Sequence, residues 1–271
     1  MKFVEISEKD RENIFNSFKE SYSWSQVAKS LKVSRAMLFK YKNGEYPLPI
    51  ELFNKISNNF SNKVEYIEIT KNKYLYKKVK KVELNETLSE IIGALAGDGH
   101  LNAKNFEVSV NCSILDKAYI NYLKELFEKL FPNLLFKINS QHNKIKLRTY
   151  SISLANYLHE EYRLPLGRKM NKLHIPRQII ENPIFLKKYL RGLFDTDGSI
   201  YFRRNHEPVV EVISRDKTYL NEVKNCLLSL GFKCGSSGKN LYIYQKKMIH
   251  KFFKDIGSSN EKHLKKYTQI V

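Results

Sequence analysis

The sequence predicts a mixed α/β (α+β) protein, in which a small helical module precedes two copies of a helix-and-strand unit. Apolar residues at helical spacing lead up to two Asp-Gly pairs, and strand-like alternation of apolar and polar residues follows each pair. Several short motifs also recur at a nearly constant separation, which is the mark of an internal repeat.

Composition excludes several classes of protein. The 271 residues are 42% hydrophobic, which is enough to bury a core and argues against a disordered chain. No apolar run approaches the roughly 18 residues that a membrane span needs. The first residues lack the pattern of a secretory signal, and the three cysteines (Cys112, Cys226 and Cys234) lack CxxC spacing. We therefore expect a cytoplasmic protein with reduced thiols.

The net charge of +19 indicates an anionic partner. Lysine and arginine occur along the whole chain, so the field extends over the molecule and attracts polyanions. Nucleic acid is the first candidate. A lysine-rich composition inherited from an AT-rich genome would give the same charge, so the charge alone does not decide.

The first element is a pair of short helices within residues 24–44. Apolar side chains at helical spacing supply one core face, and Ser34 is a good N-cap for the second helix. The spacing looks like a helix-turn-helix, whose second helix enters the major groove, although a plain helical hairpin would share it. The residues that would face DNA are Arg35, Ala36, Phe39 and Lys40.

Four segments follow from this pattern. Residues 1–60 are expected to form a small all-α helix-turn-helix domain, and residues 61–83 a basic linker with a short strand or extended stretch at Val64–Ile69. Residues 84–178 and 179–271 are the two repeated units.

The repeat is visible in two pairs of motifs. Asp98-Gly99 recurs as Asp197-Gly198, 99 residues later, and Asp116-Lys117-Ala118-Tyr119 recurs as Asp216-Lys217-Thr218-Tyr219. Each unit has the order αββαββα, and two such units in one chain suggest a pseudo-two-fold molecule that need not dimerise.

The two helices that end at Asp-Gly carry small residues four apart. These are Gly93 with Gly97 in the first helix and Gly192 with Thr196 in the second. Small side chains let helices approach closely, so the two C-termini are expected to meet. Asp98 and Asp197 would then lie side by side, and the glycines that follow them would take the left-handed conformation that ends a helix.

Such a pair of carboxylates needs a cation. Two carboxylates repel each other, and a helix C-terminus already carries about half a negative charge. A divalent ion would relieve the conflict, with the carbonyl groups of Gly97 and Thr196 as further oxygen ligands. Oxygen-only ligation favours Mg²⁺ (or Mn²⁺) over Zn²⁺. An isolated Asp-Gly is usually a turn or a cap; two of them in matched helices favour the metal site.

The two helix ends resemble a known motif. Residues 91–99 (IIGALAGDG) and 190–198 (LRGLFDTDG) are similar to the LAGLIDADG motif of homing endonucleases, and the resemblance covers about residues 84–271. It implies two units on one chain that form a saddle-shaped DNA-binding sheet. In that family the penultimate Asp of each motif binds the essential metal, a role that falls here to Asp98 and Asp197. The first motif departs from the second at Ala96, where the second has Asp195.

The resemblance also implies a basic residue near each metal site, at the end of a late strand. Lys246 fits that place in the second unit and would stabilise charge on the phosphate. In the first unit Ser151 falls at the matching point, with Lys144 or Lys146 as substitutes. This gap puts equal cutting of the two strands in doubt.

Alternation along the strands predicts a polar sheet face for DNA. Basic and polar side chains on one face suit phosphates and base edges in the major groove, while an ordinary solvent-exposed strand face would look alike. The residues on this face are Glu107, Ser109, Asn111, Lys144, Lys146, Arg148, Tyr201, Arg203 and Arg204.

Together these features predict a monomeric, Mg²⁺-dependent endonuclease that cuts a specific site in double-stranded DNA. Asp98 and Asp197 would hold the metal, and Lys246 would assist. Two alternatives remain open: a non-cleaving DNA-binding transcriptional regulator on the same fold, and an RNA-binding intron maturase. No intein splice junction is evident, so a free-standing protein is expected.

Overall fold

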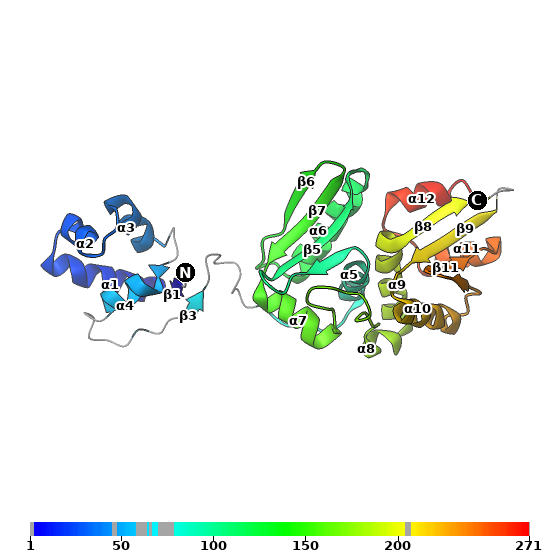
Figure 1. Ribbon diagram of the computed structural model, residues 1–271, viewed down its shortest axis with the longest axis horizontal. Helices are drawn as coiled ribbons and strands as arrows, with labels where there is room; N and C mark the ends of the chain where they lie inside the picture. Colours follow the sequence, from blue (N-terminus) through cyan, green and yellow to red (C-terminus); the bar gives the residue numbers. More distant parts are fainter. Residues whose placement is uncertain are drawn as a thin grey trace. The chain divides into compact units, whose positions relative to one another are not determined.

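A computed structural model describes residues 3–44, 48–57, 64, 67–69, 79–203 and 207–270. The chain divides into two compact units, Met1–Tyr76 and Lys77–Val271 (Figure 1). Among the helices of the described part, none combines the length and the apolar character that crossing a membrane requires.

The first unit combines helices with a small sheet. Its strands pair antiparallel in the order β2-β1-β3 beside a separate hydrophobic core. The expectation of an all-α module was wrong, because three short segments, one of them from the expected linker, pair as strands. The elements are β1 (Phe3–Glu5), α1 (Glu8–Ser21), α2 (Trp24–Ser30), α3 (Arg35–Lys42), β2 (Leu48–Pro49), α4 (Ile50–Ser57) and β3 (Ile67–Ile69).

The second unit contains the predicted repeat of helices and strands. The first half comprises α5 (Glu86–Ala96), β4 (Gly99–Leu101), β5 (Glu107–Ser113), a 3₁₀ turn at Ile114–Asp116, α6 (Lys117–Leu130), β6 (Lys137–Gln141), β7 (Lys144–Tyr150) and α7 (Ile152–Tyr162). The second half comprises α8 (Arg177–Ile180), α9 (Pro183–Asp197), β8 (Gly198–Phe202), β9 (Pro208–Ile213), α10 (Lys217–Ser229), β10 (Gly235–Ser237), β11 (Asn240–Ile243), α11 (Lys246–Asp255) and α12 (Glu261–Tyr267).

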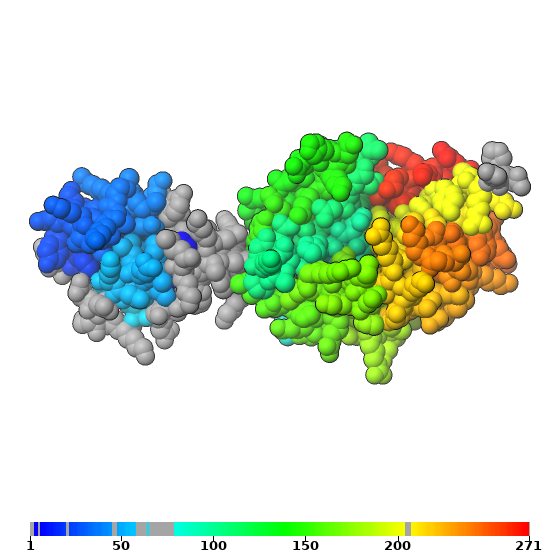
Figure 2. Space-filling model, viewed as in Figure 1, coloured from blue at the N-terminus to red at the C-terminus, as the bar shows by residue number. Residues whose placement is uncertain are grey.

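The two sheets of this unit have the same topology. Their antiparallel orders are β4-β5-β7-β6 and β8-β9-β11-β10. In each sheet the second strand in sequence lies between the first and the fourth. The mixed α/β prediction is confirmed, and both sheets are antiparallel. The helices α8 and α12 have no counterpart in the first half. In Figure 2 the green surface of the first half meets the yellow-to-red surface of the second half along one boundary.

The boundary between the halves is formed by α5 and α9, which lie side by side between the two sheets (Figure 1). A Cβ atom added to Gly93 would lie 2.0 Å from the carbonyl oxygen of Tyr189, and one added to Gly192 would lie 2.1 Å from that of Glu90. The two backbones therefore touch, which confirms the prediction from the small residues.

The glycines after the two Asp residues serve packing rather than a left-handed turn. Neither Gly99 nor Gly198 is among the residues with positive φ. A Cβ atom on Gly99 would lie 2.4 Å from the Cα of Leu95, and one on Gly198 would lie 2.2 Å from the ring of Phe194. The expected left-handed cap was wrong, because each strand doubles back so closely that only glycine fits.

Candidate active site

The two acidic helix ends meet as the small-residue spacing predicts. Asn85 caps the start of α5 with a hydrogen bond from the Leu88 amide (3.0 Å), as expected, and α5 ends one residue before Gly97. A Cβ atom on Gly97 would lie 2.0 Å from the Thr196 hydroxyl oxygen and 3.3 Å from the Asp197 carboxyl carbon. The end of α5 therefore packs directly against the last residues of α9.

The carboxyl groups of Asp98 and Asp197 both have raised pKa values, so they ionise less readily than a solvated carboxyl group. Burial, followed by repulsion from Asp98, raises the pKa of Asp197 to about 7. Asp98 is exposed as a whole residue, yet burial of its carboxylate raises its pKa to about 6, against the opposing effect of Lys169. Two such groups gain more from a shared cation than two solvated carboxylates do.

A lysine that sequence reasoning missed already supplies positive charge here. The ammonium group of Lys169, from the segment between α7 and α8, donates to the carbonyl oxygens of Leu95 (2.8 Å), Ala96 (3.1 Å) and Gly97. It thereby caps the C-terminus of α5. Burial lowers the pKa of Lys169 to about 8, and the neighbouring Asp197 and Asp98 oppose that shift.

Nothing in the local sequence marks this lysine. It lies in a basic, irregular segment, LGRKMNKLHIP, that has no periodicity to exploit. Only the return of that segment to the end of α5 brings its ammonium group between the two motifs. The carbonyl of Gly97, expected as a metal ligand, accepts a hydrogen bond from Lys169.

The strand register does not place Lys246 beside the end of α9. Gly198 pairs with Val212, and Val212 pairs with Leu241, so the strand register places Asp197 near the start of β11. From Leu241 the chain runs away from the end of α9, and Lys246 follows five residues later. Lys246 lies beyond the far end of β11, where α11 begins. It lines a hollow with Arg203 and Tyr242.

In the first half the substitute candidates separate. Ser151 caps α7 by accepting a hydrogen bond from the Leu154 amide (3.1 Å), which is a structural role. Lys146 forms an ion pair with Glu107. Lys144 pairs in the sheet with Ser113 and lowers the pKa of Asp98, so it remains the candidate on that side.

The acidic residue that distinguishes the second motif supports the backbone. Asp195 is 2% exposed, and its carboxylate accepts hydrogen bonds from the Ser258 hydroxyl and the Ser259 amide (2.8 Å). Burial raises its pKa to about 7. Asp195 thus anchors the loop before α12, an element that the first half lacks. Ala96 therefore need not provide a carboxylate at the matching place.

The polar sheet face of the first half is partly neutralised. Glu107 is buried between Lys146 and Arg148, whose guanidinium lies 3.7 Å from it. Burial alone would raise the pKa of Glu107, but the hydrogen bond from Lys146 and others hold it below its ordinary value. Ser109 is also buried, and Asn111 is half-buried. These two side chains are less accessible than the alternation predicted.

In the second half Tyr201 is half-buried and Arg203 is exposed, while Arg204 lies outside the described residues.

In the first unit, the predicted caps and turn are present. The Ser34 hydroxyl accepts a hydrogen bond from the Met37 amide (3.1 Å), which confirms the N-cap of α3. Lys32 takes positive φ (55°) in the turn where glycine is frequent. Arg35 and Lys40 are exposed on α3, and the guanidinium of Arg35 lies 5.9 Å from the ring of Phe39.

Comparison with known proteins gives a family match within the second half. A family model described as a LAGLIDADG-like domain matches residues 185–257. The chain is 25% identical to the replication factor C small subunit of Methanocaldococcus jannaschii, a match that covers 99% of this chain and 14% of that protein. The chain thus spans about a seventh of that relative's length.

Two solved structures are similar in fold. The homing endonuclease I-DmoI in complex with DNA and Ca has a TM-score of 0.47 and 16% identity, with 65% of this chain and 93% of that chain covered. The N-terminal LAGLIDADG domain of DUF199/WhiA has a TM-score of 0.46 and 18% identity, with 64% and 82% covered. The match to the LAGLIDADG-like domain model thus begins within α9, includes its acidic end at Asp197 and continues past the end of α11.

Proposed function

We propose that this protein is a site-specific endonuclease that hydrolyses phosphodiester bonds in double-stranded DNA with a divalent metal. The observation that carries the proposal is the pair of carboxylates, Asp98 and Asp197, at two helix ends in backbone contact. Their raised pKa values describe a site that favours a positively charged occupant.

The residues fit a hard cation. Within the described residues no group of three or more His, Cys, Asp or Glu side chains gathers, so an ion at this site would be held by the two carboxylates together with backbone carbonyl oxygens. The donor set is two carboxylates with the carbonyl oxygens at the end of α5, of which Lys169 already contacts three. That an ammonium group settles on these oxygens supports a preference for cations over neutral groups.

In the proposed reaction Asp98 and Asp197 hold Mg²⁺ or Mn²⁺, with Thr196 as a further candidate through its carbonyl group. When bound, such an ion supplies an activated water and stabilises charge on the phosphate. Lys169 takes the role first given to Lys246. Its ammonium keeps the end of α5 in place and presents positive charge next to both carboxylates.

The remaining surfaces would bind the duplex. The polar faces of the two sheets are proposed to lie in the major groove, with Lys144 and Arg203 as exposed or partly exposed cations. The first unit, with Arg35 and Lys40 on α3, would add a helix-turn-helix contact. Both halves lie on one chain, so a monomer would suffice and the site need not be palindromic.

Cleavage of a random duplex library in Mg²⁺, with and without EDTA, tests the proposal. Asp98→Asn and Asp197→Asn should each lower cleavage by at least about 100-fold while retaining most binding, because each removes a metal ligand. Lys169→Met should also lower cleavage, whereas Lys246→Met should not. Asp255→Asn, at a surface ion pair with Lys251, is the matched control. Cleavage that persists in the double Asp variant would refute the assignment.

A non-cleaving regulator is the second candidate, and one contact favours it. The ammonium of Lys169 contacts the Gly97 carbonyl that was expected to face a metal, and a permanent internal counter-ion would make metal unnecessary. Specific duplex binding with no strand cleavage in either Mg²⁺ or Mn²⁺ would select this reading.

A further inference from the structure

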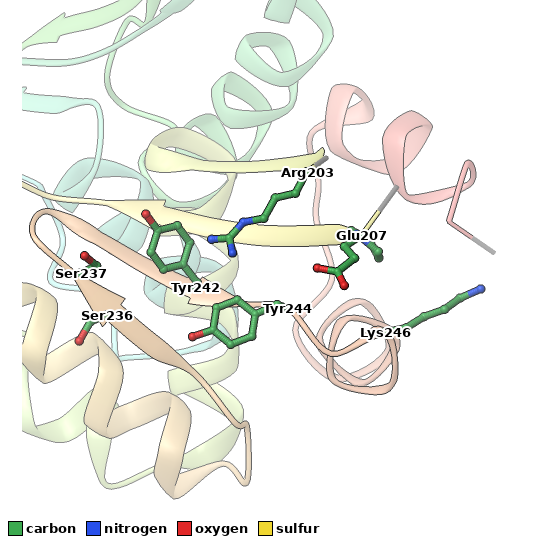
Figure 3. A pocket seen from close by; sticks show the side chains of 8 residues that line it. Arg203, Glu207, Ser236, Ser237, Tyr242, Tyr244 and Lys246 are labelled. Atoms are coloured by element: carbon green, nitrogen blue, oxygen red, sulfur yellow. The ribbon is translucent and has the colours of Figure 1, made fainter. Parts of the chain in front are cut away.

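The polar face of the second sheet contains a hollow built around one arginine. Figure 3 shows the guanidinium of Arg203 next to the rings of Tyr242 and Tyr244, with the Lys246 side chain directed away from it. The hollow is lined by Arg203, Glu207, Pro208, Ser236, Ser237, Tyr242, Tyr244 and Lys246.

The arginine is held by stacking. Its guanidinium carbon lies 5.1 Å from the centre of the Tyr242 ring and 5.5 Å from that of Tyr244. The two rings are 6.2 Å apart with an interplanar angle of 30°. Cation–π contacts of this kind fix the plane of the group while leaving its N–H edge available for hydrogen bonds.

The position of the group favours a base over a phosphate. Arg203 follows β8 at the edge of the sheet, and Tyr242 belongs to β11, with β9 between them. The Arg203 side chain from the edge strand and the Tyr242 ring from β11 therefore meet over β9, an inner strand of the sheet. A group held over the middle of a sheet that lies in the major groove faces base edges rather than the sugar-phosphate backbone.

The first half provides an internal contrast. Arg148 also lies over a tyrosine, Tyr150, at 5.7 Å. Its donors, however, are already used: Nε donates to Asn139 (2.9 Å), one terminal nitrogen donates to the Tyr150 hydroxyl (3.1 Å), and Glu107 is 3.7 Å away. Arg203 forms no ion pair with any carboxylate of the described residues, although Glu207 lines the same hollow.

We propose that Arg203 reads a guanine through O6 and N7 in the half-site that faces the second sheet, and that Tyr242 and Tyr244 are positioning residues for it. This inference rests on the proposed function, because it requires the sheet to lie in the major groove. Arginine paired with guanine in this bidentate way is a frequent specific contact. The recognition is asymmetric, since Arg148, the stacked arginine of the first sheet, matches Tyr242 in the strand register and is already engaged within its own sheet.

Selection of bound sites from a random duplex library tests it, with wild type, Arg203→Ala, Arg203→Lys and Tyr242→Leu compared. Wild type should select guanine at one position of one half-site. Arg203→Ala should lose that preference alone and weaken binding of the selected site about 5- to 150-fold. Arg203→Lys keeps the charge but loses the planar guanidinium group, and Tyr242→Leu loses a stacking ring. Both variants should therefore show a weaker preference for guanine at the same position.

A probe of the base itself separates guanine from phosphate. Replacing the selected guanine with 7-deazaguanine should weaken wild-type binding and leave Arg203→Ala binding unchanged. An unchanged selection profile, with a uniform loss of affinity and a salt dependence reduced by about one phosphate contact, would show a phosphate contact and overturn the inference. If wild type selects no duplex sequence at all, the proposed function fails instead.

Discussion

The two acidic helix ends have the same backbone arrangement but different electrostatic surroundings. Asp98 lies near three lysines that lower its pKa, Lys169, Lys262 and Lys144, whereas Asp197 has only Lys169 acting in that direction. Lys262 in turn pairs with the buried Asp116 (3.2 Å). Burial is the largest cause of both raised pKa values, to about 6 for Asp98 and about 7 for Asp197, and the lysines oppose it at more points around Asp98. A repeated motif has thus been given two non-equivalent sites by the residues around it.

The supporting loops differ in the same way. In the first half the segment after α7 carries Lys169 to the end of α5. In the second half the segment after α11 is anchored by Asp195 and Glu90, whose carboxylate accepts hydrogen bonds from the hydroxyls of Tyr122 and Ser259 (both 2.8 Å). The difference shows that pseudo-symmetry here is a property of the backbone and not of the charges.

The largest effect is expected at the contact between α5 and α9, to which each half contributes one helix. Gly93→Val and Gly192→Val each place side-chain atoms about 2 Å from a backbone carbonyl, so both should unfold the second unit or lower its stability by about 3 kcal/mol or more. Thermal melting of each variant measures this, with Lys129→Val on the exposed face of α6 as control. A well-folded variant at either position would show that the two helices can separate.

A smaller effect should distinguish the two carboxylates by pH. The pKa of Asp197 in the folded protein (about 7) lies above its ordinary value of 3.8, so the stability gained by holding a proton is present at low pH and is lost as pH rises through about 7. Asp197→Asn should therefore stabilise the metal-free protein at pH 8, by on the order of 1–2 kcal/mol after allowing for its partial exposure, and hardly at pH 4.

Asp98→Asn should give a smaller gain in the stability of the metal-free protein at pH 8, because the pKa of Asp98 is raised less, to about 6. The stability that Asp98 contributes as a protonated group is lost as pH rises through that value. Denaturant unfolding at both pH values in EDTA makes the comparison. Equal gains in the two variants, or a loss at pH 8 in either, would contradict the electrostatic difference.

The smallest effect should be a change in the pKa of Asp98 alone, at the end of α5. Lys262→Met removes a cation that lowers the pKa of Asp98 and does not act on Asp197, so it should raise the former by about half a unit and leave the latter unchanged. Carboxyl ¹³C titration measures both groups. Lys265→Met, at an exposed ion pair with Glu261, is the control, and a shift at Asp197 would mean that the two sites share their surroundings.

Much of the architecture could be predicted because it depends on local patterns. Asn85 and Ser34 cap the helices they were expected to cap, and the glycines at 93 and 192 lie at the helix contact. The predicted partners of the carboxylates were less reliable. Lys246 was placed by its position after a strand, but register decides which end of a strand lies beside Asp197, and short strands leave register undetermined by sequence.

By itself, the sequence determined the repeated unit, the close helix pair and the two carboxylates, because hydrophobic period, small residues and caps act over a few neighbouring positions. Tertiary structure alone decided which cations stand beside them. Lys169 is 71 positions from Asp98 along the chain and reaches the end of α5 only through the return of an irregular segment. Electrostatic partners are set by distance in space, and in this protein that distance follows from how the two halves pack.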